Sequence, residues 1–186
     1  PAAIAISGIV IQNGIRESDD RKSRELVIAD ITRLLYQQQE LFSDSRAVLA
    51  KYRRKGYANP NEAIERWNGH KLRWRELDEK AIAQSWAASR VLFDGDRARF
   101  SKFYGPTRQA LEEARAEYGR VFESLDESDQ IADVKAHRME ERFLACGFTY
   151  VQVLGHLWKS PRASNQDLIT VSRMAAGDGG QCGVDP

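Results

Sequence analysis

The histidines and acidic residues of this chain are the first candidates for chemistry. Helical bundles that hold two metal ions carry Glu-x-x-His pairs, so that both ligands reach the core from one helix face. The residues three positions before the histidines at 70, 137 and 156 are one tryptophan and two valines. The motif is therefore absent, and the histidines predict neither a metal site nor a cofactor.

Acidic residues cluster at Glu112, Glu113 and Glu117, and again at Glu140 and Glu141. Carboxylates one helical turn apart, such as Glu113 and Glu117, could hold a divalent metal in a helical phosphohydrolase. Arginines at positions 108, 115 and 120 are interleaved with the first group, and such mixtures usually form a solvated helix face. A soluble helical enzyme with a carboxylate-bound metal, using Glu113, Glu117 and either Glu140 or Glu141, therefore stays an alternative.

His70 lies on the same helical stripe as Trp67 and Trp74. It could transfer protons or respond to pH, although a histidine between two aromatic side chains is more often a core residue with a hydrogen-bonded ring.

Cys146 has no activating residue nearby in the sequence, and no serine stands in a G-x-S-x-G motif. We therefore predict no catalytic residue, and the sequence leaves open whether the chain is an enzyme.

Basic residues gather at Lys51, Arg53, Arg54 and Lys55, with tyrosines at positions 52 and 57. Aromatic residues among arginines can bind single-stranded nucleic acid, and the same patch could meet anionic lipid headgroups. Cations in the last turn of a helix also stabilise the helix dipole, which is their more ordinary role. A nucleic-acid-binding module using residues 51–57 is a second alternative, which the formal charge of +1 does not favour.

The elements that would position these groups are long helices. Apolar residues recur every seven positions between about Ser18 and Lys55, and this spacing keeps one stripe facing a partner helix, as in a coiled coil. The stripe consists of Val27/Ile28, Leu34/Leu35, Leu41/Phe42 and Val48/Leu49. Gln38 and Ser45 stand where further apolar residues would be expected. Gly56 is the expected stop of this helix.

Three further segments have helical spacing. The second opens at Asn59, which suits an N-cap because Pro60 fits the first helical position. The third starts near Asp96 and contains Pro106, where we expect a kink or a restart because proline lacks a backbone donor. The fourth begins around Glu127, and no charged residue occurs from Phe143 to Trp158. Short connections predict an all-α antiparallel bundle of about four long helices.

The chain divides into an apolar N-terminal segment (1–16), the helical bundle (17–160), and a short helix with a flexible Gly-rich tail (161–186). Residues 2–15 carry no charge, but they are too few to span a bilayer alone. They could be the end of a membrane helix, lie in a membrane interface, or dock on the bundle. The cations that follow predict a cytoplasmic location, at the cytoplasmic face of a membrane if residues 2–15 bind one.

The functional prediction is a non-enzymatic structural or interaction protein that acts through helix packing, associated with a membrane or part of a larger assembly. A helix that is apolar on nearly all sides is central, lies in an oligomer interface, or touches lipid. A protein partner or self-association is therefore expected; nucleic acid is not, and nothing indicates a small-molecule ligand. The residues expected at the interaction surface are Phe143, Phe148, Tyr150, Leu154, Trp158, Arg53 and Arg54.

Overall fold

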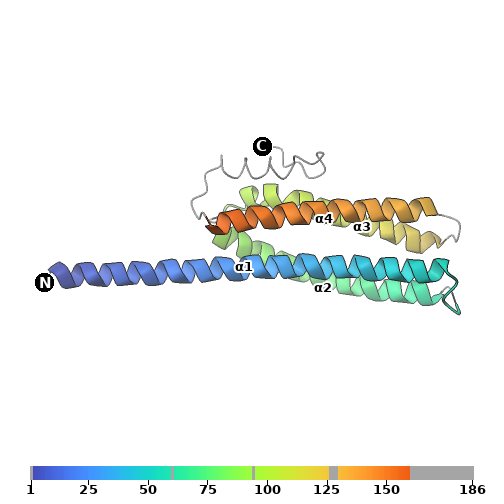
Figure 1. Ribbon diagram of the computed structural model, residues 1–186, viewed down its shortest axis with the longest axis horizontal. Coiled ribbons are helices and arrows are strands. Elements are labelled where there is room, and N and C mark those ends of the chain that lie inside the picture. The colour runs from blue at the N-terminus through green and yellow to red at the C-terminus, as the bar shows by residue number, and fades with distance from the viewer. Residues whose placement is uncertain (1, 60, 94, 126–129, 160–186) are drawn as a thin grey trace.

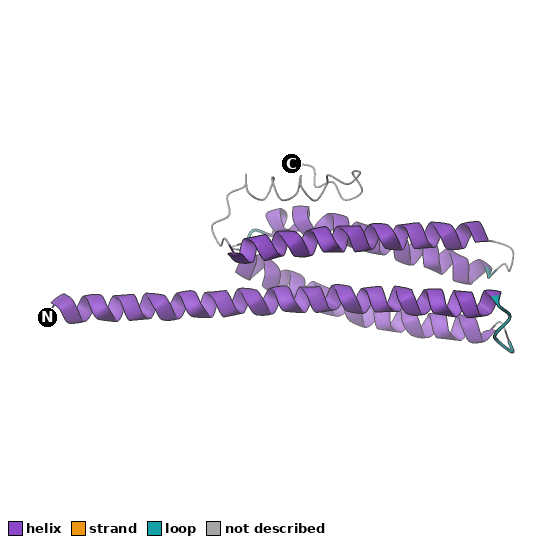
Figure 2. Ribbon diagram, viewed as in Figure 1, coloured by secondary structure: helices purple, strands orange, loops and turns teal. Residues whose placement is uncertain are grey.

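The computed structural model describes residues 2–59, 61–93, 95–125 and 130–159. Within these ranges, the side chains at positions 2–18, 99, 102–103, 130–131 and 156–159 are not described. The described residues form four helices and no strand (Figure 2), which confirms the predicted all-α bundle. The helices are α1 (Ala2–Arg53), α2 (Asn61–Leu92), α3 (Arg97–Ser124) and α4 (Gln130–Lys159). The short helix and tail expected at 161–186 lie outside the described residues.

The bundle consists of two helical hairpins that pack against each other. The most extensive contacts are those of α1 with α2 and of α3 with α4, while α1 with α4 and α2 with α3 close the ring. Consecutive helices run antiparallel, as the short connections predicted (Figure 1). The N-terminal part of α1 projects beyond the ends of the other three helices, so the two ends of the bundle differ in shape.

Helix α1 begins at Ala2, although the seven-residue repeat predicted a start near Ser18. It is a single helix of 52 residues, so the uncharged run at 2–15 continues the helix that enters the bundle. None of the helices in the described part of the chain combines the length and the hydropathy that crossing a bilayer requires.

The end of α1 and the start of α2 are set by local hydrogen bonds. Lys55 has a φ of 54°, and the N–H of Gly56 donates to the carbonyl of Lys51 at 3.0 Å. This is a Schellman motif, in which the left-handed residue is Lys55 rather than the expected glycine. The side chain of Asn59 accepts a hydrogen bond from the backbone N–H two residues later at 2.9 Å, which confirms it as the cap of α2.

Helix α3 passes through Pro106 without a break, so this segment is one helix. Pro106 cannot donate to the carbonyl one turn earlier. The next residue makes a contact across the bundle: the buried hydroxyl of Thr107 donates to the carbonyl of Cys146 in α4 at 3.1 Å. This buried bond ties α3 to α4 beside the position where the ladder of α3 lacks a donor.

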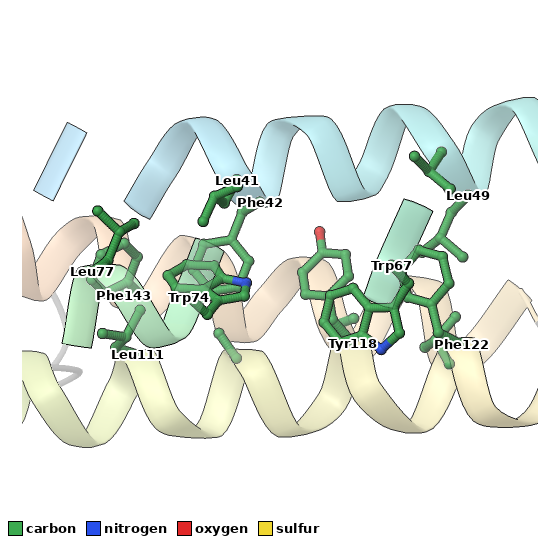
Figure 3. Close-up of a cluster of buried hydrophobic side chains, with 14 of the residues drawn as sticks. Leu41, Phe42, Leu49, Trp67, Trp74, Leu77, Leu111, Tyr118, Phe122 and Phe143 are labelled. Atoms are coloured by element: carbon green, nitrogen blue, oxygen red, sulfur yellow. The ribbon is translucent and has the colours of Figure 1, made fainter. Parts of the chain in front are cut away.

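The core contains a layer to which each helix contributes one aromatic ring. Phe42 of α1 lies 4.7 Å from Trp74, 5.4 Å from Tyr118 and 5.6 Å from Phe143, measured between ring centroids (Figure 3). All four side chains are at most 1% exposed. Tilted aromatic contacts at these separations add to the free energy that burial itself contributes. This layer therefore joins all four helices at one level.

A second aromatic cluster closes the end of the bundle from which α1 projects. Phe93 lies 5.6 Å from Phe100, and Tyr104 lies 5.3 Å from Tyr150, again between ring centroids. Ile31 of α1 and Phe93, in the loop between α2 and α3, belong to the same buried cluster. Val27 and Ile28, the first pair of the seven-residue stripe, pack against it. Burial raises the pKa of Tyr150 well above its ordinary value, so its hydroxyl stays protonated.

We expect Phe42→Ala to lower the free energy of unfolding by about 3–5 kcal/mol, because it removes the ring that contacts the other three helices. Ile82→Ala, at an exposed position on α2, should change this free energy by no more than about 0.5 kcal/mol. Urea unfolding followed by circular dichroism measures both. Equal losses in the two variants would contradict the assignment of Phe42 to the centre of the core.

Candidate functional site

A groove of about 380 Å³ lies between α1 and α4, and no charged residue lines it. Its walls come from α1 (Thr32, Leu35, Tyr36, Gln39) and from α4 (Phe143, Leu144, Gly147, Phe148, Val151). Gly147 of α4 lies beside Leu35 of α1: a Cβ atom at this glycine would meet the Leu35 side chain at 3.7 Å, an ordinary van der Waals contact.

Two aromatic side chains stand exposed in this groove. Tyr36 is 63% exposed and Phe148 is 66% exposed, although both are large and largely apolar. An exposed apolar patch around a groove is typical of an interaction surface. Chemically, the groove offers aromatic and aliphatic contacts, a few neutral polar groups from Thr32 and Gln39, and no charge.

Among the residues expected on α4, Phe148 is exposed at this surface, and Phe143 belongs to the groove lining although it is buried. Phe143, Tyr150 and Leu154 are at most 2% exposed and pack inside the bundle, so the expectation that these three present themselves to a partner is corrected. At 100° per residue, Phe148 lies roughly 140° around the helix from Phe143, which explains why one is outside and the other inside. The side chain of Trp158 lies outside the described part.

Arg53 and Arg54 differ in what they contact. The guanidinium of Arg53 donates to both carboxylate oxygens of Asp133 on α4, at 3.0 and 2.9 Å, in a half-buried pair. This bidentate contact fixes the end of α1 against the start of α4. Arg54 is exposed. Beside it, Lys51 places its ammonium 4.3 Å from the centre of the Tyr57 ring, so much of the basic patch is engaged within the chain.

Two of the acidic residues considered as metal ligands form ion pairs with cations of α4. Glu113 pairs with Arg142 of α4, and Glu117 pairs with Lys135 at 2.9 Å. Burial tends to raise the pKa of Glu117, but hydrogen bonds from Lys135 and from the neighbouring arginine outweigh it and hold this pKa below its ordinary value. Within the described residues, no group of three or more potential metal ligands occurs.

Glu140 is the one of these acids that enters the core, where its side chain is 1% exposed. The hydroxyl of Tyr118 donates to its Oε2 atom at 2.7 Å. Arg46 lies 3.3 Å from Oε1 without hydrogen-bond geometry, so this second contact is purely an ion pair. His137 lies 3.6 Å from Oε2 at the surface side. Burial, and then the hydrogen bond to Glu140, raise the pKa of Tyr118 far above its ordinary value.

This cluster around the buried carboxylate joins three helices, and its Arg46 and His137 side chains reach the surface. A buried carboxylate is costly unless it is paired and hydrogen-bonded, and here the partners come from α1 and α3. Because the carboxylate accepts a bond from one helix and faces a cation from another, it fixes the register among α1, α3 and α4. The sequence pattern did not identify it, because Glu140 was considered there only as a possible metal ligand beside Glu141.

His70 has the hydrogen-bonded ring expected of a core histidine. Its Nδ1 atom lies 3.0 Å from the hydroxyl of Ser45, and that hydroxyl donates to the carbonyl of Leu41 at 2.7 Å. Ser45 has therefore used its hydrogen, so Nδ1 of His70 carries the proton and donates. Burial lowers the pKa of His70, and the positive charges of Arg73 and Arg66 act in the same direction against the opposing effect of Asp44.

The part of the groove that sequence reasoning missed lies on α1. Tyr36 follows Leu34 and Leu35 but falls outside the seven-residue stripe. An aromatic residue off the core stripe of an otherwise regular repeat is the signal that could have identified it. No family model, curated protein or solved structure matches this chain, so the argument for a function comes from the surface alone.

Replacing Tyr118 by Phe tests the buried cluster. Loss of the hydroxyl leaves the Glu140 carboxylate short of a hydrogen bond, and we expect the unfolding free energy to fall by about 1–3 kcal/mol. The same substitution in a Glu140→Leu background should cost much less, because the group that needs the bond is gone. Tyr36→Phe, at the exposed groove, is the control and should be nearly neutral. Equal costs in both backgrounds would refute the coupling.

The lowered pKa of His70 makes stability depend on pH. Because folding favours the neutral ring, its contribution is fully present above pH of about 6.5 and is lost as the pH falls through the lower pKa of the folded state. Unfolding free energies measured between neutral and mildly acidic pH should therefore decrease toward acid. In the His70→Asn variant, the unfolding free energy should decrease less as the pH falls, because the titrating ring is gone. An unchanged dependence of this free energy on pH would show that His70 does not cause it.

Proposed function

We propose that this chain is a non-enzymatic helical interaction protein that pairs with a second copy of itself through the α1–α4 groove. The observation that carries the proposal is the exposure of Tyr36 and Phe148 around an uncharged groove. Burying such side chains releases free energy in proportion to their apolar area. The free energy of binding at such a surface comes from burial of apolar area, so an apolar partner surface suits it better than a charged one.

The absence of charge on the groove lining supports a second copy as the partner. Across a twofold axis the same patch meets itself, so any charge on it would face or adjoin its own copy and repel it. The lining of the groove has no such charge. Other exposed apolar residues are placed differently: Leu72, for example, stands between Lys71 and Arg73. The groove is therefore better suited to self-association than the outer face of α2.

The shape of the groove also suits a twofold contact. Phe148 stands at its rim, so two copies related by a twofold axis can each place this ring in the groove of the other. A stable interface buries about 800 Å² on each partner. Tyr36 and Phe148 are 63% and 66% exposed, so together they can contribute roughly 200–330 Å², given about 150–250 Å² for a fully buried aromatic side chain. The remainder must come from the residues of α1 and α4 around the groove. A location at the cytoplasmic face of a membrane stays a prediction.

Phe148→Glu tests this proposal. In the proposed contact, this carboxylate would be buried in the uncharged groove of the other copy without a cation to pair with, so we expect the dimer to dissociate to a monomer with unchanged helicity. Sedimentation velocity and light scattering measure the mass, and circular dichroism the helicity. Ile82→Glu is the matched control, because it places the same charge at an exposed apolar position on α2, and it should remain a dimer.

A wild-type chain that sediments as a monomer would refute the proposal. So would an Ile82→Glu variant that dissociates as completely as Phe148→Glu, because the effect would then follow from added charge rather than from the groove.

A further inference from the structure

A second surface lies at the end of the bundle from which α1 projects, and it is independent of the groove. The end of α2 and the start of α3 enclose a hollow of about 510 Å³. It is lined by Trp86, Ala87, Ser89, Arg90, Gly95 and Arg97. Gly95 has a φ of 83°, a conformation that glycine adopts readily, and this turns the chain between the two helices. The hollow thus combines an aromatic side chain with two cations.

The two arginines are available to an anion. Among the described residues, neither Arg90 nor Arg97 has an ion-pair partner, whereas many other arginines of the bundle pair with a carboxylate, as Arg53 and Arg115 do. Arg97 instead lies 3.4 Å over the ring of Trp86. Stacking on an indole holds a guanidinium in place while its N–H groups remain able to donate.

Trp86 is 54% exposed, which is unusual for the largest apolar side chain. Its position on α2 is two residues before Ala88, which shares a buried cluster with Ile31 of α1. Trp86 and the arginines therefore lie at the level where α1 leaves the bundle (Figure 1). Tryptophan beside arginine is the combination found at membrane–water interfaces, where the ring sits among headgroups and the cation meets phosphate.

The uncharged run of α1 begins on the same side. Between Ile15 and Ile31 the helix rises by about 24 Å, at roughly 1.5 Å per residue. Arg90 lies in the last turn of α2 and Arg97 is the first residue of α3, so both belong to the end of the bundle from which α1 projects. The segment of α1 that follows the uncharged run, residues 16–25, carries charges of both signs, and Arg21 pairs there with Glu25 at 3.5 Å.

The geometry points to a headgroup-binding surface formed by Trp86, Arg90 and Arg97, which holds this end of the bundle against a membrane containing anionic phospholipid. The arginines contact lipid phosphate, the indole lies among the headgroups, and residues 2–15 of α1 enter the interface beyond them. Asp96 adjoins Arg97 in the sequence but is not part of the lining of the hollow; its backbone carbonyl accepts the N–H of Phe100 at the start of α3. This inference does not depend on pairing through the groove.

Vesicle binding by the full chain tests the inference. The probes are vesicles of phosphatidylcholine alone and vesicles that also contain phosphatidylserine, and binding is measured by co-sedimentation. We expect clear binding only with phosphatidylserine, and an affinity about tenfold lower in the Arg90→Gln/Arg97→Gln variant. The emission of Trp86 should shift to shorter wavelength on binding, and this component should be missing in Trp86→Phe.

Arg54→Gln/Arg66→Gln is the matched control, because it removes the same charge from exposed positions at the opposite end of the bundle. It should bind within about twofold of the wild type, with the helicity of all variants checked by circular dichroism. Equal weakening in both double variants, or equal binding to neutral vesicles, would overturn the proposal. Displacement from vesicles by inorganic phosphate at constant ionic strength would also overturn it, since the hollow would then be a site for a soluble anion.

Discussion

The contact of Phe42 with one aromatic ring from each of the other helices holds the two hairpins together. Two polar contacts adjoin this layer. Tyr118 belongs to the layer through its ring and reaches Glu140 through its hydroxyl. Ser45, one turn after Phe42, meets the ring of His70. Polar groups can be accommodated in this core because the aromatic layer fixes the helices closely enough for short hydrogen bonds between them.

Helix α4 has more apolar surface than the bundle can cover. Its faces toward α3 and α1 bury Phe143 and Tyr150, and the remainder emerges at Phe148. Two neighbouring helices cover only part of the circumference of a third, so a helix that is apolar on nearly all sides must leave one side exposed. On α1, Tyr36 meets that side from across the groove. The proposed pairing of two copies would bury the surface that packing within one chain leaves open.

The two ends of the bundle differ in how their cations are used. At the end where α1 meets α2, Arg53 is held by Asp133 and Lys51 lies against Tyr57. At the other end, Arg97 stacks on Trp86 without a carboxylate partner among the described residues. Charges that are already paired contribute little to binding an external anion, whereas cations held by stacking keep their donors available. The cation held by stacking on Trp86 is therefore at the end of the bundle from which α1 projects (Figure 1).

The sequence by itself determined that the elements are long helices, because helical spacing of apolar residues and an N-cap such as Asn59 are local features of one segment. Spacing also showed that Phe143 and Phe148 lie on one apolar helix, but not which of them faces the interior. That choice, like the burial of Glu140 and the continuity of α3 through Pro106, was decided by the tertiary structure. The physical reason is that a residue's own helix sets its angle around the axis, whereas its exposure depends on which neighbouring helix covers that angle.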